Sequence, residues 1–354
     1  MDLPPEKQQL LQDKLTIEAD LKIRQGNYLQ AGKLYQESGR YKDGALIFFN
    51  YADALSEQNN IIMEANLKKM EIENARKNSI QVLMQQRGFE MEDQESFEMV
   101  KKEVESECPI DPVIIEISNK KEISPLILKQ LYVLAGILAE KYQQQNKEKS
   151  KQIFNKSYNK NKLLASMALD TMLEEEVDAG KDCKRLIEQC WRPAEAYHYY
   201  ILVFNLLRNN QLIVAQHAAQ YLIEYEDILG YDRVYSILLR VAVMTKQMAL
   251  AKLACQKLKK SKTLSITHRG QVKNMVESIF KIYADVDARP HDNLLTMEDS
   301  GGGKLKKTKY PRCIASGRPL TACQFWMCAQ CRHSAFEEEI TKFSNCPLCY
   351  IKVE

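Results

Sequence analysis

The sequence has 354 residues, of which 45% are hydrophobic and 27% are charged, and its formal net charge at pH 7 is only +3. This is the composition of a globular protein, and the near balance of charge gives no indication of nucleic-acid binding. Only 13 glycines and 10 prolines are present, so long helices are favoured over many short strands and turns. The length allows two domains, or one repeat array followed by a small module.

No secretory or membrane-spanning segment is recognisable. The first seven residues carry charge and two prolines where a secretory signal requires an apolar core. The longest apolar stretches, Tyr199–Leu207 and Tyr235–Met244, are half the length of roughly 20 residues that a bilayer-spanning helix needs. We therefore expect a soluble, intracellular protein without a transmembrane segment.

A repeated pattern of glycine, polar residue and tyrosine marks the first part of the chain. Gly26-Asn27-Tyr28 is followed by Ala31, and the pattern recurs 13 residues later as Gly39-Arg40-Tyr41 followed by Gly44-Ala45. In each unit the glycine ends one helix, the tyrosine opens the next, and the small residue lets neighbouring helices approach closely. Residues 13–56 therefore predict a helix, a turn and a second helix.

A second repeated pair lies further along the chain. Asn210-Gln211-Leu212 recurs 36 residues later as Lys246-Gln247-Met248, close to the period of 34 that is typical of tetratricopeptide repeats. One helical pair is too small to bury its own apolar face, so several must stack. The sequence thus predicts an all-α fold with a tetratricopeptide-like solenoid over residues 1–285; an irregular helical bundle is the alternative. The matched small and apolar positions are Ala215, Ala218 and Leu222, then Ala251, Ala254 and Leu258.

Biased segments interrupt and end this array. Residues 90–112 combine an acidic run with two prolines and predict a loop or insertion. Residues 141–162, rich in Lys, Asn and Gln, predict a solvated helix face or a low-complexity loop, although they could bind an acidic surface. Residues 286–310 contain three consecutive glycines and a lysine cluster, which indicate a flexible linker. Residues 311–354 form the last predicted domain.

Six of the ten cysteines lie in the last 42 residues, and four of them form two Cys-x2-Cys pairs. The pairs Cys328/Cys331 and Cys346/Cys349 are separated by 14 residues. Thiolates two residues apart on a tight turn can bind one ion, so two such turns can supply a closed tetrahedron of sulfur around Zn²⁺. A closed site leaves no position for an activated water. The sequence predicts a structural zinc ion, with reduced, unbound thiols as the alternative.

Three further residues, Cys313, Cys323 and His333, are possible additional ligands. With the four cysteines they give seven potential ligands in an order similar to that of a RING finger, which needs eight for two zinc ions. His333 could replace a sulfur or remain at the surface. Cys313 and Cys323 could hold a second ion with His333, or could simply pack.

Other sequence features give no support for catalysis. None of the five histidines lies in a metalloprotease, nucleophile-elbow or Rossmann context, so we expect no catalytic residue and no small-molecule substrate. His198, between tyrosines, is expected to pack inside a helical core. The apolar run Phe325-Trp326-Met327 is expected to form a small core over the zinc and to dock the module on the last helices, with an aromatic binding surface as the alternative.

Several motifs over residues 190–354 resemble the tail of the large WD-repeat subunits of intraflagellar transport complex A. The motifs are Trp191–Tyr200, Tyr225–Ile228, Cys313–Leu320 and Gln324–Cys331 together with Cys346–Cys349. Cys323 has no counterpart in the family pattern. Such subunits carry two propellers before their solenoid, and this sequence contains no propeller pattern. The resemblance therefore implies a C-terminal portion or a split gene product.

The resemblance also implies a function. The solenoid and zinc module would bind other protein subunits of complex A for retrograde ciliary transport and cilium assembly. The expected locations are the cilium and its base, the cytoplasm and the cytoskeleton. The alternative class is a RING-type ubiquitin ligase or a vesicle-tethering subunit with a terminal RING, in which two zinc ions would be expected.

Overall fold

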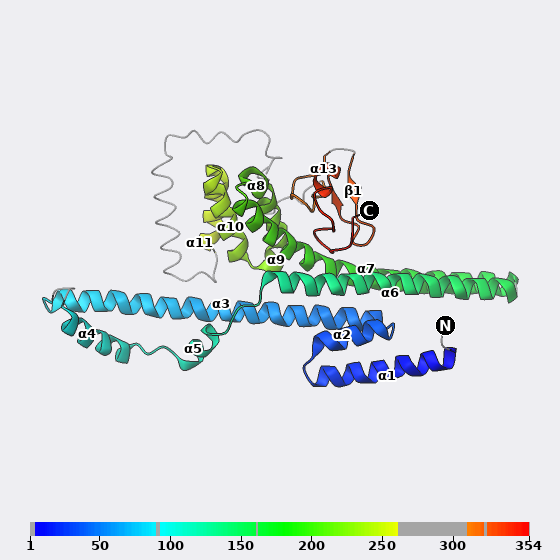
Figure 1. Ribbon diagram of the computed structural model, residues 1–354, viewed down its shortest axis with the longest axis horizontal. Helices are drawn as coiled ribbons and strands as arrows, with labels where there is room; N and C mark the ends of the chain where they lie inside the picture. Colours follow the sequence, from blue (N-terminus) through cyan, green and yellow to red (C-terminus); the bar gives the residue numbers. More distant parts are fainter. Residues whose placement is uncertain (1–3, 90–92, 161, 261–309, 322–323, 354) are drawn as a thin grey trace. The chain divides into compact units, whose positions relative to one another are not determined.

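We describe the protein from a computed structural model that places residues 4–89, 93–160, 162–260, 310–321 and 324–353. These ranges are largely helical, with a small cysteine-rich module near the C-terminal end (Figure 1). Within them, no helix combines the length and the apolar character needed to cross a bilayer. The helices before the module are α1 (Pro5–Arg24), α2 (Tyr28–Glu37), α3 (Tyr41–Gln86), α4 (Gln94–Glu107), α5 (Pro112–Ser118), α6 (Pro125–Lys160), α7 (Lys162–Arg208), α8 (Leu212–Tyr221), η1 (Leu222–Tyr225), α9 (Glu226–Leu229), α10 (Tyr231–Met244) and α11 (Met248–Lys260).

Four turns of one geometry connect helices at the positions that the sequence repeats predict. Gly26, Gly39, Asn210 and Lys246 all have left-handed φ values, between 56° and 75°. In each turn the amide of the next residue donates to the carbonyl five residues earlier, at 2.8–2.9 Å. This bond satisfies a carbonyl that the helix end would otherwise leave free. The predicted tetratricopeptide-like, all-α fold is confirmed.

The chain divides into two compact units. The first contains residues 1–55, 124–229 and 307–354, and the second contains residues 56–123 and 230–306. The cysteine-rich module therefore belongs to the same unit as α6, α7 and α8. Most of the predicted linker, residues 286–309, lies outside the described residues, as does the end of the predicted solenoid, residues 261–285.

The second unit corrects the prediction of a loop at residues 90–112. Most of that segment is helical, in α4 and the start of α5. Asp93 begins α4 by accepting hydrogen bonds from two backbone amides of the first turn. The acidic side chains occupy the outer face, while apolar residues at helical spacing face α3. The segment is therefore an amphipathic helix, whose apolar spacing is hard to recognise among so many charged residues. The buried residues of this contact are Ile80, Met84, Val100 and Val104.

In the first unit, α6 and α7 lie side by side and form the support for the module (Figure 1). The described part of the Lys-, Asn- and Gln-rich segment is helical, as an extension of α6. Tyr132 of α6 stacks on Tyr197 of α7, with ring centroids 5.9 Å apart, and its hydroxyl donates to Asp53 at 2.7 Å. Further along, the indole of Trp191 packs directly over Gly136, where a Cβ atom would lie 2.7 Å from the ring.

This close contact makes a testable prediction for Gly136→Ala. Overpacking the indole costs about 1–3 kcal/mol, more than the gain of up to about 1 kcal/mol from replacing glycine within a helix. We therefore expect a lower free energy of unfolding, measured by chemical denaturation. Gln130→Ala, on the exposed face of the same helix, should change it by less than about 0.5 kcal/mol. Equal effects of the two substitutions would contradict the packing argument.

Candidate metal centre

The C-terminal module is built from short hairpins with little regular structure. Strand β1 (Trp326–Met327) pairs antiparallel with β2 (Ser334–Ala335), and α13 (Glu337–Ile340) follows. Two isolated bridges, Arg312 with Pro319 and Asn345 with Lys352, close one hairpin on either side of this pair. Each Cys-x2-Cys pair lies at the tip of a hairpin, so the fold brings two distant sequence segments to one point.

The two cysteine turns have the same backbone geometry. In the first knuckle, residues 328–333, the Cys328 amide donates to the carbonyl of His333 and the Arg332 amide donates to the carbonyl of Cys328, both at 2.9 Å. In the second knuckle, residues 346–351, the same two bonds measure 2.7 and 2.9 Å. Arg332 and Tyr350 occupy the left-handed position of their turns, with φ values of 57° and 64°.

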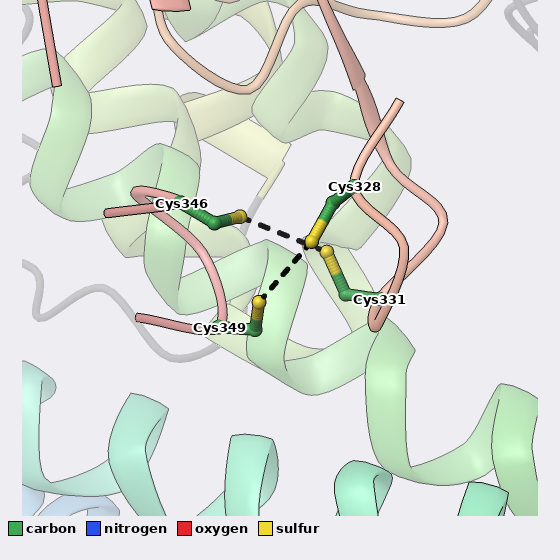
Figure 2. Close-up of side chains that lie close together, drawn as sticks. All are labelled: Cys328, Cys331, Cys346 and Cys349. Atoms are coloured by element: carbon green, nitrogen blue, oxygen red, sulfur yellow. Dashed lines mark hydrogen bonds between the residues drawn. The ribbon is translucent and has the colours of Figure 1, made fainter. Parts of the chain in front are cut away.

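The four sulfur atoms converge on one point (Figure 2). Cys328 Sγ lies 3.5 Å from Cys349 Sγ, Cys331 Sγ lies 3.8 Å from Cys346 Sγ, and all four lie within 4.8 Å of one another. Zn–S bonds of about 2.3 Å place sulfurs about 3.8 Å apart at the corners of a tetrahedron, whereas a disulfide needs about 2.05 Å. The residues present therefore fit a zinc ion and do not fit a pair of disulfides.

Burial makes this cluster depend on a cation. All four cysteines are buried. The hydrogen bonds that the sulfurs share raise the pKa of Cys331 and lower the pKa of Cys346. A Zn²⁺ ion would offset half of the charge of four thiolates and reduce the repulsion between them.

A buried lysine from α6 lies behind the second knuckle. The Lys129 ammonium donates to the carbonyl of Pro347 at 2.6 Å and lies 4.5 Å from the centre of the Tyr350 ring. Burial lowers the pKa of Lys129 to about 8, while the charges of Cys346 and Cys349 act to raise it. A four-thiolate zinc site carries two negative charges, so this ammonium is placed to compensate one of them.

The first knuckle is held by two glutamates of the helical hairpin. Glu140 of α6 accepts one hydrogen bond from Gln330 at 2.7 Å and another from the indole of Trp191 at 3.0 Å. Burial raises the pKa of Glu140. Glu195 of α7 accepts from the ring of His333, whose other nitrogen donates to the Cys331 carbonyl at 2.6 Å. Burial alone lowers the pKa of His333, but the hydrogen bond to Glu195 raises it.

The structure places two of the three additional candidates, His333 and Cys313, outside the sulfur cluster. Both nitrogens of His333 are engaged as donors, which leaves no lone pair for a metal. Cys313 is buried elsewhere in the module, where its Sγ donates to Glu339 at 2.9 Å. Cys323 lies outside the described residues. Among the residues that the structure places, Cys328, Cys331, Cys346 and Cys349 are the one group found with metal-binding geometry.

One packing expectation is wrong. Phe325 and Met327 are 48% and 57% exposed, so they do not form a core over the sulfur cluster. They flank Trp326 in the module's two-residue strand, which is too short to bury both faces. Other apolar side chains fill the module instead, including Ile314, Ala335, Ile340 and Leu348.

Sequence reasoning did not find the residues that hold the module on the helices. Lys129, Glu140 and Glu195 are charged residues that become buried only when distant segments meet, so no local pattern marks them. Glu195 lies within the Trp191–Tyr200 motif, and this motif is the sequence feature that could have indicated its role. His198 packs in the core, as expected, and its ring donates to the carbonyl of Ile314 at 2.6 Å.

Family models match part of the helical region and the whole cysteine-rich module. Residues 188–287 match the family model "IFT121-like, TPR repeats", and residues 311–354 match "IFT121, second zinc finger domain". The second match covers the whole module, including the four clustered cysteines. The module is therefore a zinc finger with a structural zinc ion.

Curated relatives agree with the family models. The chain is 36% identical over 235 residues to WD repeat-containing protein 35 of Homo sapiens, and 35% identical over the same length to those of Rattus norvegicus and Mus musculus. The alignments cover 66% of this chain but only 19% of each relative. The chain therefore spans about a fifth of the length of these relatives.

Loss of a single thiolate tests the sulfur cluster. In a Trp326→Phe background, Trp191 is the one remaining tryptophan, and it lies 5.8 Å from the ring of His333. We expect Cys346→Ser to abolish zinc binding, measured by elemental analysis, and to shift Trp191 emission to longer wavelength as the module separates from the helices. Helicity measured by circular dichroism should change little. Cys108→Ser, at an exposed thiol, is the control; full zinc content in Cys346→Ser would refute the four-sulfur site.

Removal of the buried ammonium tests the charge balance. We expect Lys129→Met to weaken zinc affinity roughly tenfold, because the methionine keeps much of the side-chain volume but no longer offsets the thiolate charge. Competition with a chromophoric chelator gives the measurement. Lys147→Met, at an exposed lysine of the same helix, should leave the affinity unchanged. An unaltered affinity in Lys129→Met would show that the ammonium does not contribute.

Proposed function

We propose that this chain, a homologue of WD repeat-containing protein 35 with IFT121-type repeats and an IFT121-type zinc finger, is a non-catalytic subunit of intraflagellar transport complex A. The observation that carries the proposal is the match of both the repeats and the zinc finger, residues 188–287 and 311–354. The chain spans about a fifth of its relatives' length. Its proposed contribution is therefore that of this region, which is to bind and position other protein subunits.

The proposed zinc ligands fit a structural role. We assign Cys328, Cys331, Cys346 and Cys349 as the ligands, and four sulfurs complete a tetrahedral coordination sphere. No coordination position then remains for a water or a substrate, so the ion would stabilise the module without taking part in a reaction. The binding of Glu140, Glu195 and Lys129 to the same module supports this role, because it fixes the finger on the helices.

An exposed apolar stripe on α1 supports a role in protein binding. Leu10, Ile17 and Leu21 are 56%, 69% and 50% exposed. Residues seven and four positions apart lie on the same face of a helix, so these three side chains form one stripe. Such a stripe is the type of surface that binds an apolar face of another protein.

The cellular role follows from the same proposal. As part of complex A, the chain would act in retrograde ciliary transport and cilium assembly, at the cilium and its base. Its partners would be other protein subunits of the complex, with neither nucleic acid nor a small-molecule substrate required.

Co-purification from ciliated cells tests the proposed function. The tagged chain should recover complex A subunits, and Cys346→Ser should recover less because the finger no longer stays on the helices. Cys108→Ser should behave as the unmodified chain. Ile17→Asp should also reduce recovery, whereas Gln12→Asp, at an exposed polar position of the same helix, should not. Absence of complex A subunits from the unmodified chain's eluate would contradict the proposal, and ubiquitin transfer by the purified chain would support the RING-ligase alternative.

A further inference from the structure

A third turn of the module repeats the backbone geometry of the two knuckles. The Cys313 amide donates to the carbonyl of Arg318 at 2.9 Å, and the Gly317 amide donates to the carbonyl of Cys313 at 2.7 Å. The first, fifth and sixth residues of the turn thus make the same two bonds as their equivalents in residues 328–333 and 346–351. Gly317 occupies the left-handed position, with φ 73°. Three hairpins of this module therefore end in one type of turn.

The third turn differs from the knuckles in its side chains. Ser316 stands at the position that Cys331 and Cys349 occupy in the other two turns, so only one thiol remains. The Ser316 hydroxyl instead accepts from the Arg318 amide of the same turn at 3.4 Å. Burial and a hydrogen bond to Glu339 raise the pKa of Cys313, and its thiol donates to the Glu339 carboxylate at 2.9 Å.

A guanidinium group supplies the positive charge at this turn. Arg318 pairs with the carboxylate of Glu339, which also accepts from the Cys313 thiol at 2.9 Å. The guanidinium lies 4.8 Å from the centre of the Phe336 ring, and the Phe336 amide points to the Cys313 sulfur at 3.5 Å. These side chains close the third turn with protein groups alone, where the other two turns use sulfurs around a common point.

We propose that residues 313–318 are a metal-free third knuckle, closed by the Arg318–Glu339 ion pair, and that this turn adds a docking contact with α7 and α8 to the contacts that the two zinc knuckles make with α6 and α7. The inference rests on the assignment of zinc to the other two knuckles, which Cys346→Ser tests separately. It predicts one zinc ion per chain and a specific docking contact.

The docking contact is made by the backbone of the third knuckle. The buried ring of His198 in α7 donates to the Ile314 carbonyl at 2.6 Å, and burial lowers the pKa of His198 to about 3, so the ring is neutral. A Cβ atom on Gly317 would lie 2.7 Å from the Cβ of Ala218 in α8. The flanking Arg312 guanidinium lies 5.2 Å from the centre of the Tyr221 ring.

The glycine at the left-handed position lets the backbone of this turn lie close to the backbone of α8. Arg332 and Tyr350 carry side chains at that position in the zinc knuckles, whereas the third knuckle has Gly317. The missing side chain lets the turn approach the α8 backbone, since a Cβ atom would also lie 2.9 Å from the Cα of Ala218. The six residues 313–318 thus lack a second thiol and make the close contact with α8.

Zinc content tests the metal-free assignment in the full chain. We expect one zinc ion per chain in the unmodified protein and one in Cys313→Ser, measured by elemental analysis after exhaustive removal of free metal. Cys346→Ser, in contrast, should contain none. Two ions in the unmodified chain, or loss of an ion in Cys313→Ser while Cys346→Ser retains the other, would overturn the assignment.

A matched pair of glycine substitutions tests the docking contact. Gly317→Ala and Gly26→Ala place a Cβ at the same φ of 73°, but only Gly317 faces another helix; nothing lies within 4 Å of a Cβ at Gly26. With Trp191 as the only tryptophan, we expect Gly317→Ala to shift emission toward that of zinc-free Cys346→Ser while one zinc ion per chain is retained. Gly26→Ala should leave the emission unchanged.

Arg318→Met provides a second test that does not change the backbone. It should produce the same emission shift with zinc retained, because the third turn would lose the ion pair that closes it. Unshifted emission in both Gly317→Ala and Arg318→Met would overturn the docking role. Loss of zinc in Arg318→Met would overturn the separation between the third knuckle and the metal centre.

Discussion

The mutual repulsion of buried thiolates is the constraint on which the C-terminal part of the structure depends. Four sulfurs within 4.8 Å of one another cannot all be ionised without a cation between them. A zinc ion reduces the repulsion but leaves a site with net negative charge. A positive group nearby stabilises such a site. The buried ammonium of Lys129 meets that requirement from α6, so the metal centre and the helical hairpin form one electrostatic arrangement.

The contacts between finger and helices are specific because they are polar and buried. Glu140, Glu195 and Lys129 each lie in the contact with a defined partner, and separating any of them would leave an uncompensated group in a site of low dielectric. Apolar side chains could slide over one another with little loss. These hydrogen-bonded groups fix a single docked position instead.

Local patterns predicted most of the turns but few of the long-range contacts. The left-handed turns at Gly26, Gly39, Asn210 and Lys246 and the two cysteine knuckles depend on neighbouring residues, so the sequence was sufficient to identify them. The acidic segment was misread because its charges conceal the helical spacing of Phe97, Val100 and Val104. Tertiary contacts between distant segments decide that Phe325 and Met327 are exposed and that Glu195 is buried. Composition does not specify which segments make those contacts.

The positions of the finger's anchors have a consequence for the helical hairpin. Lys129 and Glu140 are on α6, whereas Glu195 and His198 are on α7, and the finger contacts all four. Sliding one helix along the other by a single turn, about 5.4 Å, would pull two anchors out of reach while the other two stayed in place. The zinc finger therefore connects both helices, and its four anchors hold the helices in one longitudinal register.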